Sequence, residues 1–541
     1  MQKQPRRQLQ KESDSLSDWD RREFLKFVGK SSLALTSATT LLPWLSACDV
    51  LTPPLQGFPL TPIPATQKDD LILSPELNAR VLIRWNDPIG PKKNQTRFGF
   101  NNDFIEWIPT SPTTGILWVN HEYPDPLFVS GYSTREKVPK SIEQIQKEKK
   151  SVGGSLLQLK KNPTTERWEG DFEHPMNRRL DATTPIAFAW PEPISGSRVA
   201  TGTLANCAGG KTDWNTILTC EENYQFFYGS KADYQWERDG NHPDTHYGWV
   251  VEVNPLSESA RKLVSLGRFS HESATFTRST EGLPVVYSGD DAQDECLYKF
   301  IGSTKNSLAH GTLYVANLQS KTWVPLDFQT QPSLQKAFKN QTEVLIHARE
   351  AAKLVGGTPL DRPEDIAIHP NSKDVFVALT NHAKKRNYYG SLMKLKEANQ
   401  DPGSLSFEWE TFLWGGKNSE LVCPDNLAFD PKGNLWVTSD ISGTVINHGP
   451  YAGFGNNGLF LIPMSGLHAG NPIRVASAPV NAELTGPCFT PDGKTLFLSV
   501  QHPGEYSPSP TQLKSHWPDG GNTLPKPAVV EISLSKEFWI E

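Results

Sequence analysis

The chain contains short segments in which hydrophobic and polar residues alternate, and four of these segments run into a proline. They lie at 104–109, 366–370, 427–431 and 488–491. A period of two is typical of a β-strand with one buried face, and proline ends such a strand at a turn. A second apolar run follows each segment, at 115–119, 375–379, 434–438 and 495–500. The pattern therefore predicts four β-hairpins closed by turns containing Pro, Gly or Asp.

Two further regions carry weaker copies of the same hairpin. One pairs 273–277 with 283–288, and the other lies within 204–219, where 215–218 supplies the second strand. The last three proline-ended units recur at roughly 60 residues, a length that accommodates four strands. We therefore predict an all-β fold, a six-bladed β-propeller, whose blades cover one another and leave only short sheet edges. The 40 glycines, 43 prolines and 10% aromatic residues agree with many short strands.

Alignment of the hairpins on the turn proline places acidic residues at the start of the first strands. Asp103, Glu364 and Asp425 stand six residues before a proline, and Glu272 has the same spacing to Arg278, which replaces the proline. The remaining two hairpins carry Asn206 and Thr485 at the comparable places. If the first strands line the channel, these side chains gather at one end of it.

Residues that directly follow the second strands are polar as well. They are 120–122, 219–223, 288–291, 380–382, 439–440 and 501–502. Both open ends of a hairpin lie at the same edge, so these residues share the channel mouth. Carboxylates this close together repel and raise each other's pKa, so we expect bound cations. Oxygen ligands suit calcium, whereas the thiol of Cys220 beside carboxylates, with few histidines, indicates iron rather than zinc.

Arg362 lies two residues before Glu364 in the sequence LDRPED (360–365). A guanidinium group beside a polycationic site is repelled unless an anion bridges the two, and its planar fork matches phosphate oxygens. The sequence thus predicts a phosphate-binding arginine. The alternative is a salt bridge from Arg362 to Asp361 or Asp365.

The N-terminal segment has the features of an export signal. Arg21 and Arg22 open a twin-arginine motif, and the modestly apolar stretch that follows, at 27–45, is too polar to span a membrane. The sequence LSAC (45–48) resembles a lipobox, with Cys48 as the acylated residue. We therefore predict a signal at 1–48, a proline-rich tether at 49–70 and the propeller at 71–541. Its partners would be the twin-arginine export machinery and, through a lipid on Cys48, a membrane.

Charge and cysteine content narrow the possibilities further. The net charge of −6 and the absence of a basic stripe exclude nucleic acid as a partner. Apart from Cys48 five cysteines remain, an odd number with no spacing typical of a disulfide framework. Four of them are interpreted as core residues, namely Cys207, Cys296, Cys423 and Cys488.

Seven short segments, in this order along the chain, resemble the markers of the PhoX-type alkaline phosphatase family. They are NHE (120–122), TCEEN (219–223), HES (271–273), GDD (289–291), RPED (362–365), PDN (424–426) and QHPGE (501–505). Each is weak alone, but their number and order make the resemblance specific. It extends over most of the chain after the predicted signal.

The resemblance implies a phosphomonoesterase, with some action on diesters, in the periplasm or at the cell surface. It implies two Fe³⁺ ions that share a cysteine thiolate, several Ca²⁺ ions, and an oxide or hydroxide on the metals as the nucleophile. Arg362 would hold phosphate with help from Asn206. The metal ligands would be Cys220, Glu272, Glu364, Asp425, Glu122, Glu221 and Asp291. We further expect a monomer that acts on small phosphate esters.

Two alternatives remain open on the sequence. A calcium-dependent lactonase or phosphotriesterase also places acids around a propeller axis, but it has no use for a thiolate or for Arg362. A non-catalytic surface propeller would bind calcium and a partner without turnover.

Overall fold

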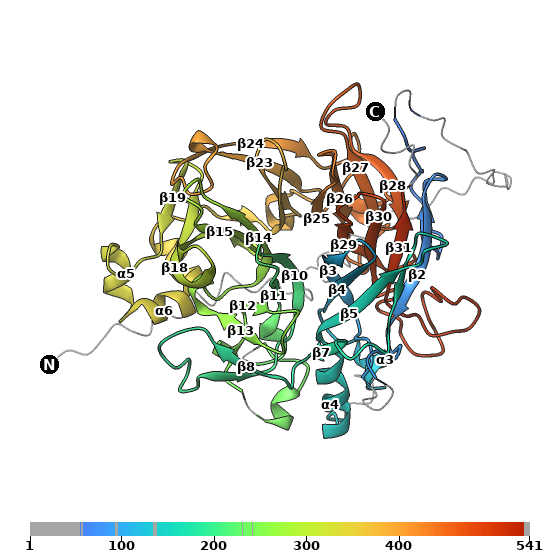
Figure 1. Ribbon diagram of the computed structural model, residues 1–541, viewed down its shortest axis with the longest axis horizontal. Coiled ribbons are helices and arrows are strands. Elements are labelled where there is room, and N and C mark those ends of the chain that lie inside the picture. Colours follow the sequence, from blue (N-terminus) through green and yellow to red (C-terminus); the bar gives the residue numbers. More distant parts are fainter. Residues whose placement is uncertain are drawn as a thin grey trace, which may run out of the picture.

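In the computed structural model, residues 55, 58–91, 96–133, 138–229, 231–240 and 242–534 are described. Six sheets, antiparallel except where β8 pairs with β13, surround a central axis, and strands β3, β10, β14, β25 and β29 lie nearest to it (Figure 1). The predicted six-bladed β-propeller is therefore confirmed. Among the described helices, none is long and apolar enough to cross a membrane.

Every blade is one sheet, in which four strands follow one another outward from the axis. The innermost strands are β3 (Asn102–Ser111), β10 (Asn206–Lys211), β14 (His271–Arg278), β21 (Pro363–Ile368), β25 (Pro424–Phe429) and β29 (Glu483–Phe489). The second strands are β4 (Thr114–His121), β11 (Ile217–Glu221), β15 (Pro284–Asp290), β22 (Val375–Leu379), β26 (Leu435–Ser439) and β30 (Thr495–Gln501). These twelve strands are the six hairpins that the sequence predicts.

The outer layers complete the blades. The third strands are β5 (Gly153–Lys161), β12 (Val250–Val253), β17 (Leu297–Thr304), β23 (Ser391–Glu397), β27 (Gly458–Ile462) and β31 (Ala528–Ser533). The fourth are β6 (Trp168–Gly170), β13 (Ala260–Leu263), β18 (Ser307–Asn317), β24 (Phe407–Trp414), β28 (Ile473–Ser477) and β2 (Asn78–Arg84). Additional edge strands are β1 (Ile72–Leu73), β7 (Arg178–Leu180), β8 (Pro185–Phe188), β9 (Val199–Thr201) and β19 (Thr322–Pro325).

The ring closes because β2, from the N-terminal part of the chain, pairs with β31 in the sixth blade. Part of the predicted tether also contacts the propeller. Leu60 is 2% exposed and packs with core residues of the fifth and sixth blades, and the carbonyl of Thr66 accepts a hydrogen bond from the Asn456 N–H. The predicted signal and Cys48 lie outside the described residues.

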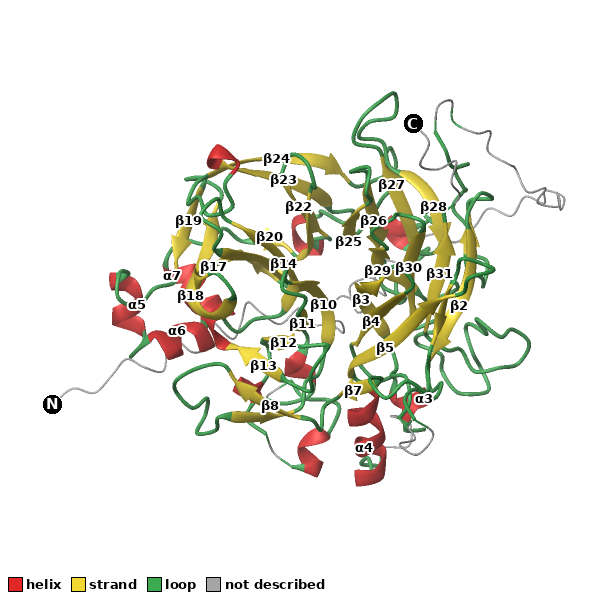
Figure 2. Ribbon diagram, viewed as in Figure 1, coloured by secondary structure: helices red, strands yellow, loops and turns green. Residues whose placement is uncertain are grey.

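The core lies between neighbouring sheets, where large side chains fill the gap between blades. Trp107 of β3 packs against Phe497 of β30, with ring centroids 5.6 Å apart, and so joins the first and sixth blades. The α-helices lie at the periphery of the strands (Figure 2). They are α3 (Pro126–Val129), α4 (Ile142–Ser151), α5 (Pro332–Ala337), α6 (Gln341–Ile346) and α7 (Ala348–Leu354).

Candidate metal centre at the channel mouth

All six inner strands carry a β-bulge at the same place. In the first blade, Asn102 pairs with His121 and Ile105 with Val119, so two residues of β3 face a single residue of β4. The bulged pairs are Asp103–Phe104, Cys207–Ala208, Ser273–Ala274, Glu364–Asp365, Asp425–Asn426 and Gly486–Pro487. Bulges redirect side chains and are frequent beside active sites. Here the same bulge occurs in all six blades around one axis.

The bulges correct the alignment made on the turn prolines. Asp103, Glu364 and Asp425 share the first bulge position, as predicted, but Asn206, Glu272 and Thr485 each lie one residue earlier. In the third blade the two strands of the hairpin pair as far as Arg278 and Pro284. The position that the turn proline occupies in the first, fourth and fifth blades therefore falls on the residue after Arg278. A turn proline therefore marks the hairpin but does not fix its register.

The backbone just before four of the inner strands is left-handed. Asn101, Ala205, Arg362 and Cys423 have φ values of 53°, 54°, 58° and 48°. Such a conformation is costly for residues other than glycine and persists only where the surrounding structure imposes it. At Arg362, which immediately precedes β21, the left-handed conformation sets the direction in which the side chain extends from the backbone.

Cys207 lies at the centre of the acidic cluster. Its Sγ is 3.0 Å from Oδ2 of Asp103. Two groups of ligand atoms, one from Asp103, Glu122 and Cys207 and the other from Cys207, Glu222 and Glu272, each fit within 4.8 Å. The thiol thus stands between two pairs of carboxylates, as a ligand shared by two cations would.

The carboxylates of this cluster are destabilised as anions. Burial, together with the negative charge of neighbouring carboxylates, raises the pKa of Glu222, Glu272 and Glu364 well above the usual range. Burial also raises the pKa of Asp103 to about 7. Within the described residues, Oε1 of Glu222 and Oε2 of Glu272 are buried and accept no hydrogen bond. Buried oxygens of this kind need a cation or a proton, and a hard cation suits them.

Three of the predicted site residues have other partners in the structure. Cys220 is fully buried on β11 in an apolar core cluster with Leu218 and Val250. Glu221 accepts hydrogen bonds from Lys262 Nζ at 2.6 Å and from the Gly248 N–H and Trp249 N–H.

Asn206 is likewise part of a buried hydrogen-bond network rather than of the cluster. Its amide nitrogen donates to Oγ1 of Thr203 at 2.8 Å and to Oγ1 of Thr219 at 2.9 Å. Both amide hydrogens are used, so none is left for a phosphate oxygen.

The cluster instead contains Cys207, Asp103 and Glu222, which the sequence analysis did not select as ligands. One signal was available, because Asn-Asp-Phe at 102–104 and Asn-Cys-Ala at 206–208 occupy the same position in successive blades. Asp425 belongs with this group. Glu364, Asp440 and Asp103 add to burial in raising its pKa.

Arg362 is bound to carboxylates, but not to those considered from the sequence. Nε and Nη2 contact the two carboxylate oxygens of Asp291 at 2.8 and 2.6 Å, and Nη2 also lies 2.6 Å from Oε1 of Glu364. Asp291, predicted as a metal ligand, therefore holds the guanidinium group of Arg362 in this structure. The side chain of Arg362 remains 24% exposed, so a ligand in the channel can reach it.

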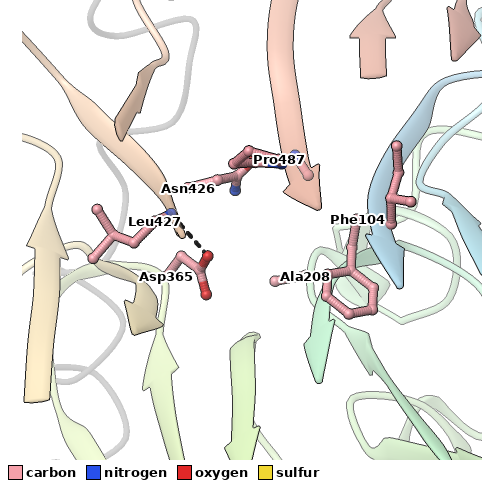
Figure 3. A pocket seen from close by; sticks show the side chains of 8 residues that line it. Phe104, Ala208, Asp365, Asn426, Leu427 and Pro487 are labelled. Carbon is pink, nitrogen blue, oxygen red and sulfur yellow. Dashed lines mark hydrogen bonds between the residues drawn. The ribbon is translucent and has the colours of Figure 1, made fainter. Parts of the chain in front are cut away.

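Below the cluster the second bulge residues narrow the channel. Phe104, Ala208, Asp365, Asn426 and Pro487 surround a cavity of about 40 Å³, and Asp365 accepts a hydrogen bond from the Leu427 N–H at 2.9 Å (Figure 3). A space of this size holds about one water molecule. A second cavity of about 580 Å³ adjoins it at the hairpin-turn end. This cavity shares Phe104, Asp365 and Pro487 with the small one, and three turn prolines line it.

Fold and site together define a β-propeller enzyme that concentrates carboxylates, one thiol and one arginine at a channel mouth. Comparison with known proteins identifies the family. The profile of the alkaline phosphatase PhoX family matches residues 58–504, and the chain belongs to this family. The predicted alkaline phosphatase is thus confirmed.

A solved structure agrees with this assignment. PhoX of Pseudomonas fluorescens, in complex with vanadate as a transition-state analogue, is 28% identical with a TM-score of 0.80, covering 89% of this chain and 98% of that one. A gluconolactonase of Xanthomonas campestris is 10% identical (TM-score 0.37; 88% and 98% covered). The calcium structure of a Trichoderma reesei AA12 enzyme is 11% identical (TM-score 0.38; 87% and 98% covered). Neither of the last two adds to the assignment. No curated protein sequence matches the chain.

Proposed function

We propose that this phosphatase hydrolyses phosphomonoesters, and to some extent diesters, outside the cytoplasm with a mixed iron and calcium centre. The observation that carries the proposal is the position of Cys207 between Asp103–Glu122 and Glu222–Glu272. Cys207 takes the role for which the sequence favoured Cys220.

The donor set supports such a centre. Its buried carboxylate oxygens suit Ca²⁺ or Fe³⁺, and the thiol favours iron over calcium. Gln501 Nε2 lies 3.2 Å from Oδ2 of Asp103 and 2.9 Å from Oε2 of Glu122, so it orients both carboxylates from outside the cluster. Bound cations would polarise the phosphoryl group as Lewis acids. Glu272, Glu364 and Asp425 complete the proposed ligand set.

Arg362 is the residue we assign to phosphate. Asp291 engages its Nε and Nη2 and thereby fixes the plane of the guanidinium group. A fixed fork recognises phosphate oxygens at a lower entropic cost than a mobile cation does, and it stabilises negative charge that develops on them. Vanadate, which the Pseudomonas fluorescens enzyme binds, should compete with substrate here and depend on Arg362.

The location follows from the N-terminal signal. The twin-arginine motif at Arg21 and Arg22 supports export of the folded protein, and a lipid on Cys48 would keep it at the membrane surface. Mass spectrometry of the exported protein tests this assignment. A mature chain that begins at an acylated Cys48 is expected, and a chain that begins elsewhere would contradict it.

Elemental analysis combined with turnover tests the metal centre. Protein exported in folded form should contain iron and calcium and hydrolyse p-nitrophenyl phosphate at alkaline pH. Chelation should remove metal and turnover together, and restoring both ions should return them. Calcium without iron in fully active protein would contradict the iron assignment, and activity that survives complete chelation would contradict metal dependence.

A further inference from the structure

Helix α7 is joined by ion pairs to the segment that carries Asp291. Arg349 contacts both oxygens of Asp290, with Nε 2.8 Å from Oδ2 and Nη2 in contact with Oδ1. One turn later, Lys353 Nζ lies 2.6 Å from Oε1 of Glu295. The helix therefore holds residues on both sides of Asp291, and the carboxylate of Asp291 forms an ion pair with Arg362.

Asp290 and Asp291 are tied together through one backbone residue. The Ser270 N–H donates to Oδ1 of Asp290 at 3.2 Å, and the Asp291 N–H donates to the carbonyl of Ser270 at 3.0 Å. A movement of the Asp290 carboxylate is therefore transmitted to the backbone of Asp291.

A small two-stranded sheet connects the same segment to the arginine. Strand β16 (Gln293–Glu295) pairs with β20 (Leu360–Asp361), with Gln293 opposite Asp361. Asp361 directly precedes Arg362. The side chain of Arg362 and the backbone of the residue before it are thus both attached to the segment that α7 holds.

The charge balance makes Arg349 the sensitive point of this arrangement. The Asp290 side chain is fully buried, and Asp291 and Glu295 beside it are also acidic. Among the described residues, Arg349 is the only cation that forms an ion pair with Asp290, so its removal leaves a buried carboxylate without a counterion. Lys353 differs, because its side chain is 56% exposed and its partner Glu295 is less deeply buried than Asp290, with 11% of the side chain exposed against 0%.

We infer that Arg349 is a positioning residue for phosphate binding, which acts through Asp290 and Asp291 to hold the Arg362 fork. The inference rests on the proposed role of Arg362. Neither α7 nor Arg349 contacts the acidic cluster through any hydrogen bond or ion pair of the described residues, so the effect is exerted through the Asp290–Asp291 segment.

The test compares Arg349→Met with Lys353→Met, which removes the neighbouring ion pair of the same helix. Each variant is purified with its metals, and the metal content, the melting temperature, kcat, KM and the vanadate inhibition constant are measured. Arg349→Met should keep its iron and calcium, lose about tenfold or more in kcat/KM, and bind vanadate correspondingly more weakly, because small displacements of a positioning group are costly. Lys353→Met should stay within about threefold of the parent enzyme.

A double variant separates positioning from general damage. Asp290→Asn in the Arg349→Met background removes the unpaired buried charge, while the amide oxygen still accepts from the Ser270 N–H. Activity and vanadate affinity should then return to within about threefold of the parent enzyme. If Arg349→Met retains the kinetics of Lys353→Met, or if the double variant is no better than the single one, the inference is wrong. Arg362→Ala serves as the separate check on the proposed function, because unchanged kinetics there would refute the role of Arg362 itself.

Discussion

Removal of the metal ions should make the stability of this protein strongly dependent on pH. Asp103 is 2% exposed, and burial raises its pKa from 3.8 to about 7. A carboxyl group whose pKa is raised on folding contributes its full stability below the unfolded pKa, and this contribution is lost as the pH rises through the folded pKa. The metal-free protein should therefore lose stability between about pH 4 and pH 7, and it should lose more above pH 7 as the other cluster carboxylates ionise.

The size of the effect can be worked from Asp103. A shift from 3.8 to about 7 corresponds to about 4 kcal/mol between the protonated and ionised forms. Glu222, Glu272 and Glu364 titrate in the same direction, so this figure describes one member of a coupled set. For a chain of this length, 4 kcal/mol lowers the melting temperature by on the order of 4 °C.

Thermal unfolding of chelated and metal-loaded protein between pH 5 and 8 provides the assay. The lower limit avoids carboxyl groups such as Asp401 and Asp492, whose lowered pKa values make them act in the opposite direction at acidic pH. The melting temperature of the chelated protein should fall as the pH rises. The difference in melting temperature between the loaded and the chelated protein should increase, because cations bind the ionised carboxylates. Asp103→Asn should flatten the slope of the chelated protein. The buried His121 and His271, whose lowered pKa values act in the opposite direction below about pH 6.5, are common to the chelated, loaded and Asp103→Asn proteins. A chelated protein whose melting temperature changes with pH in the same way as that of the loaded protein or of chelated Asp103→Asn would therefore refute the reasoning.

Three further predictions concern neighbouring residues with different roles. Glu222→Gln should lower metal content and turnover with little loss of folding stability. Glu221→Ala should leave metal binding intact but lower the free energy of unfolding by about 3–5 kcal/mol, because Lys262 stays buried without its partner. Urea unfolding and elemental analysis together distinguish the two variants. Asn206→Ala should cost about 1–3 kcal/mol in the same unfolding assay through its broken hydrogen bonds, and a loss of kcat without loss of stability would restore its predicted catalytic role. Arg362→Ala should retain metal and lose on the order of 10²-fold or more in kcat, and an unchanged rate in a p-nitrophenyl phosphate assay would show that its carboxylate contacts are its main function.

The architecture was predictable because each blade repeats a local signal. Alternation followed by proline at 366–370 and 427–431 marks a hairpin without knowledge of its neighbours, and the six hairpins observed are those predicted. Order and number of the weak motifs were enough to indicate the family. Glu364 and Asp425 were placed at the site because they coincide in repeat position, and the bulges keep that coincidence.

Selection between adjacent residues was not predictable from the same signals. Cys220 and Glu221 lie in an acidic motif, yet the β-strand that contains them directs Cys220 into the core and Glu221 toward Lys262. The bulge on β10 brings Cys207 to the channel instead, and a bulge leaves no clear mark in the sequence. Similarly, the pairing of Arg362 with Asp291 depends on a contact between two blades that sequence spacing does not reveal.

The central claim is a metal centre built around Cys207, and a matched pair of cysteine variants tests it most directly. Cys207→Ser and Cys220→Ser make the same chemical change at two cysteines, one half-buried within the acidic cluster and one buried in the apolar core. Iron content and p-nitrophenyl phosphate turnover are measured for both, with the melting temperature as the check on folding. The account predicts that Cys207→Ser loses iron and turnover while Cys220→Ser keeps both. Full iron content and activity in Cys207→Ser, or their selective loss in a folded Cys220→Ser, would contradict it.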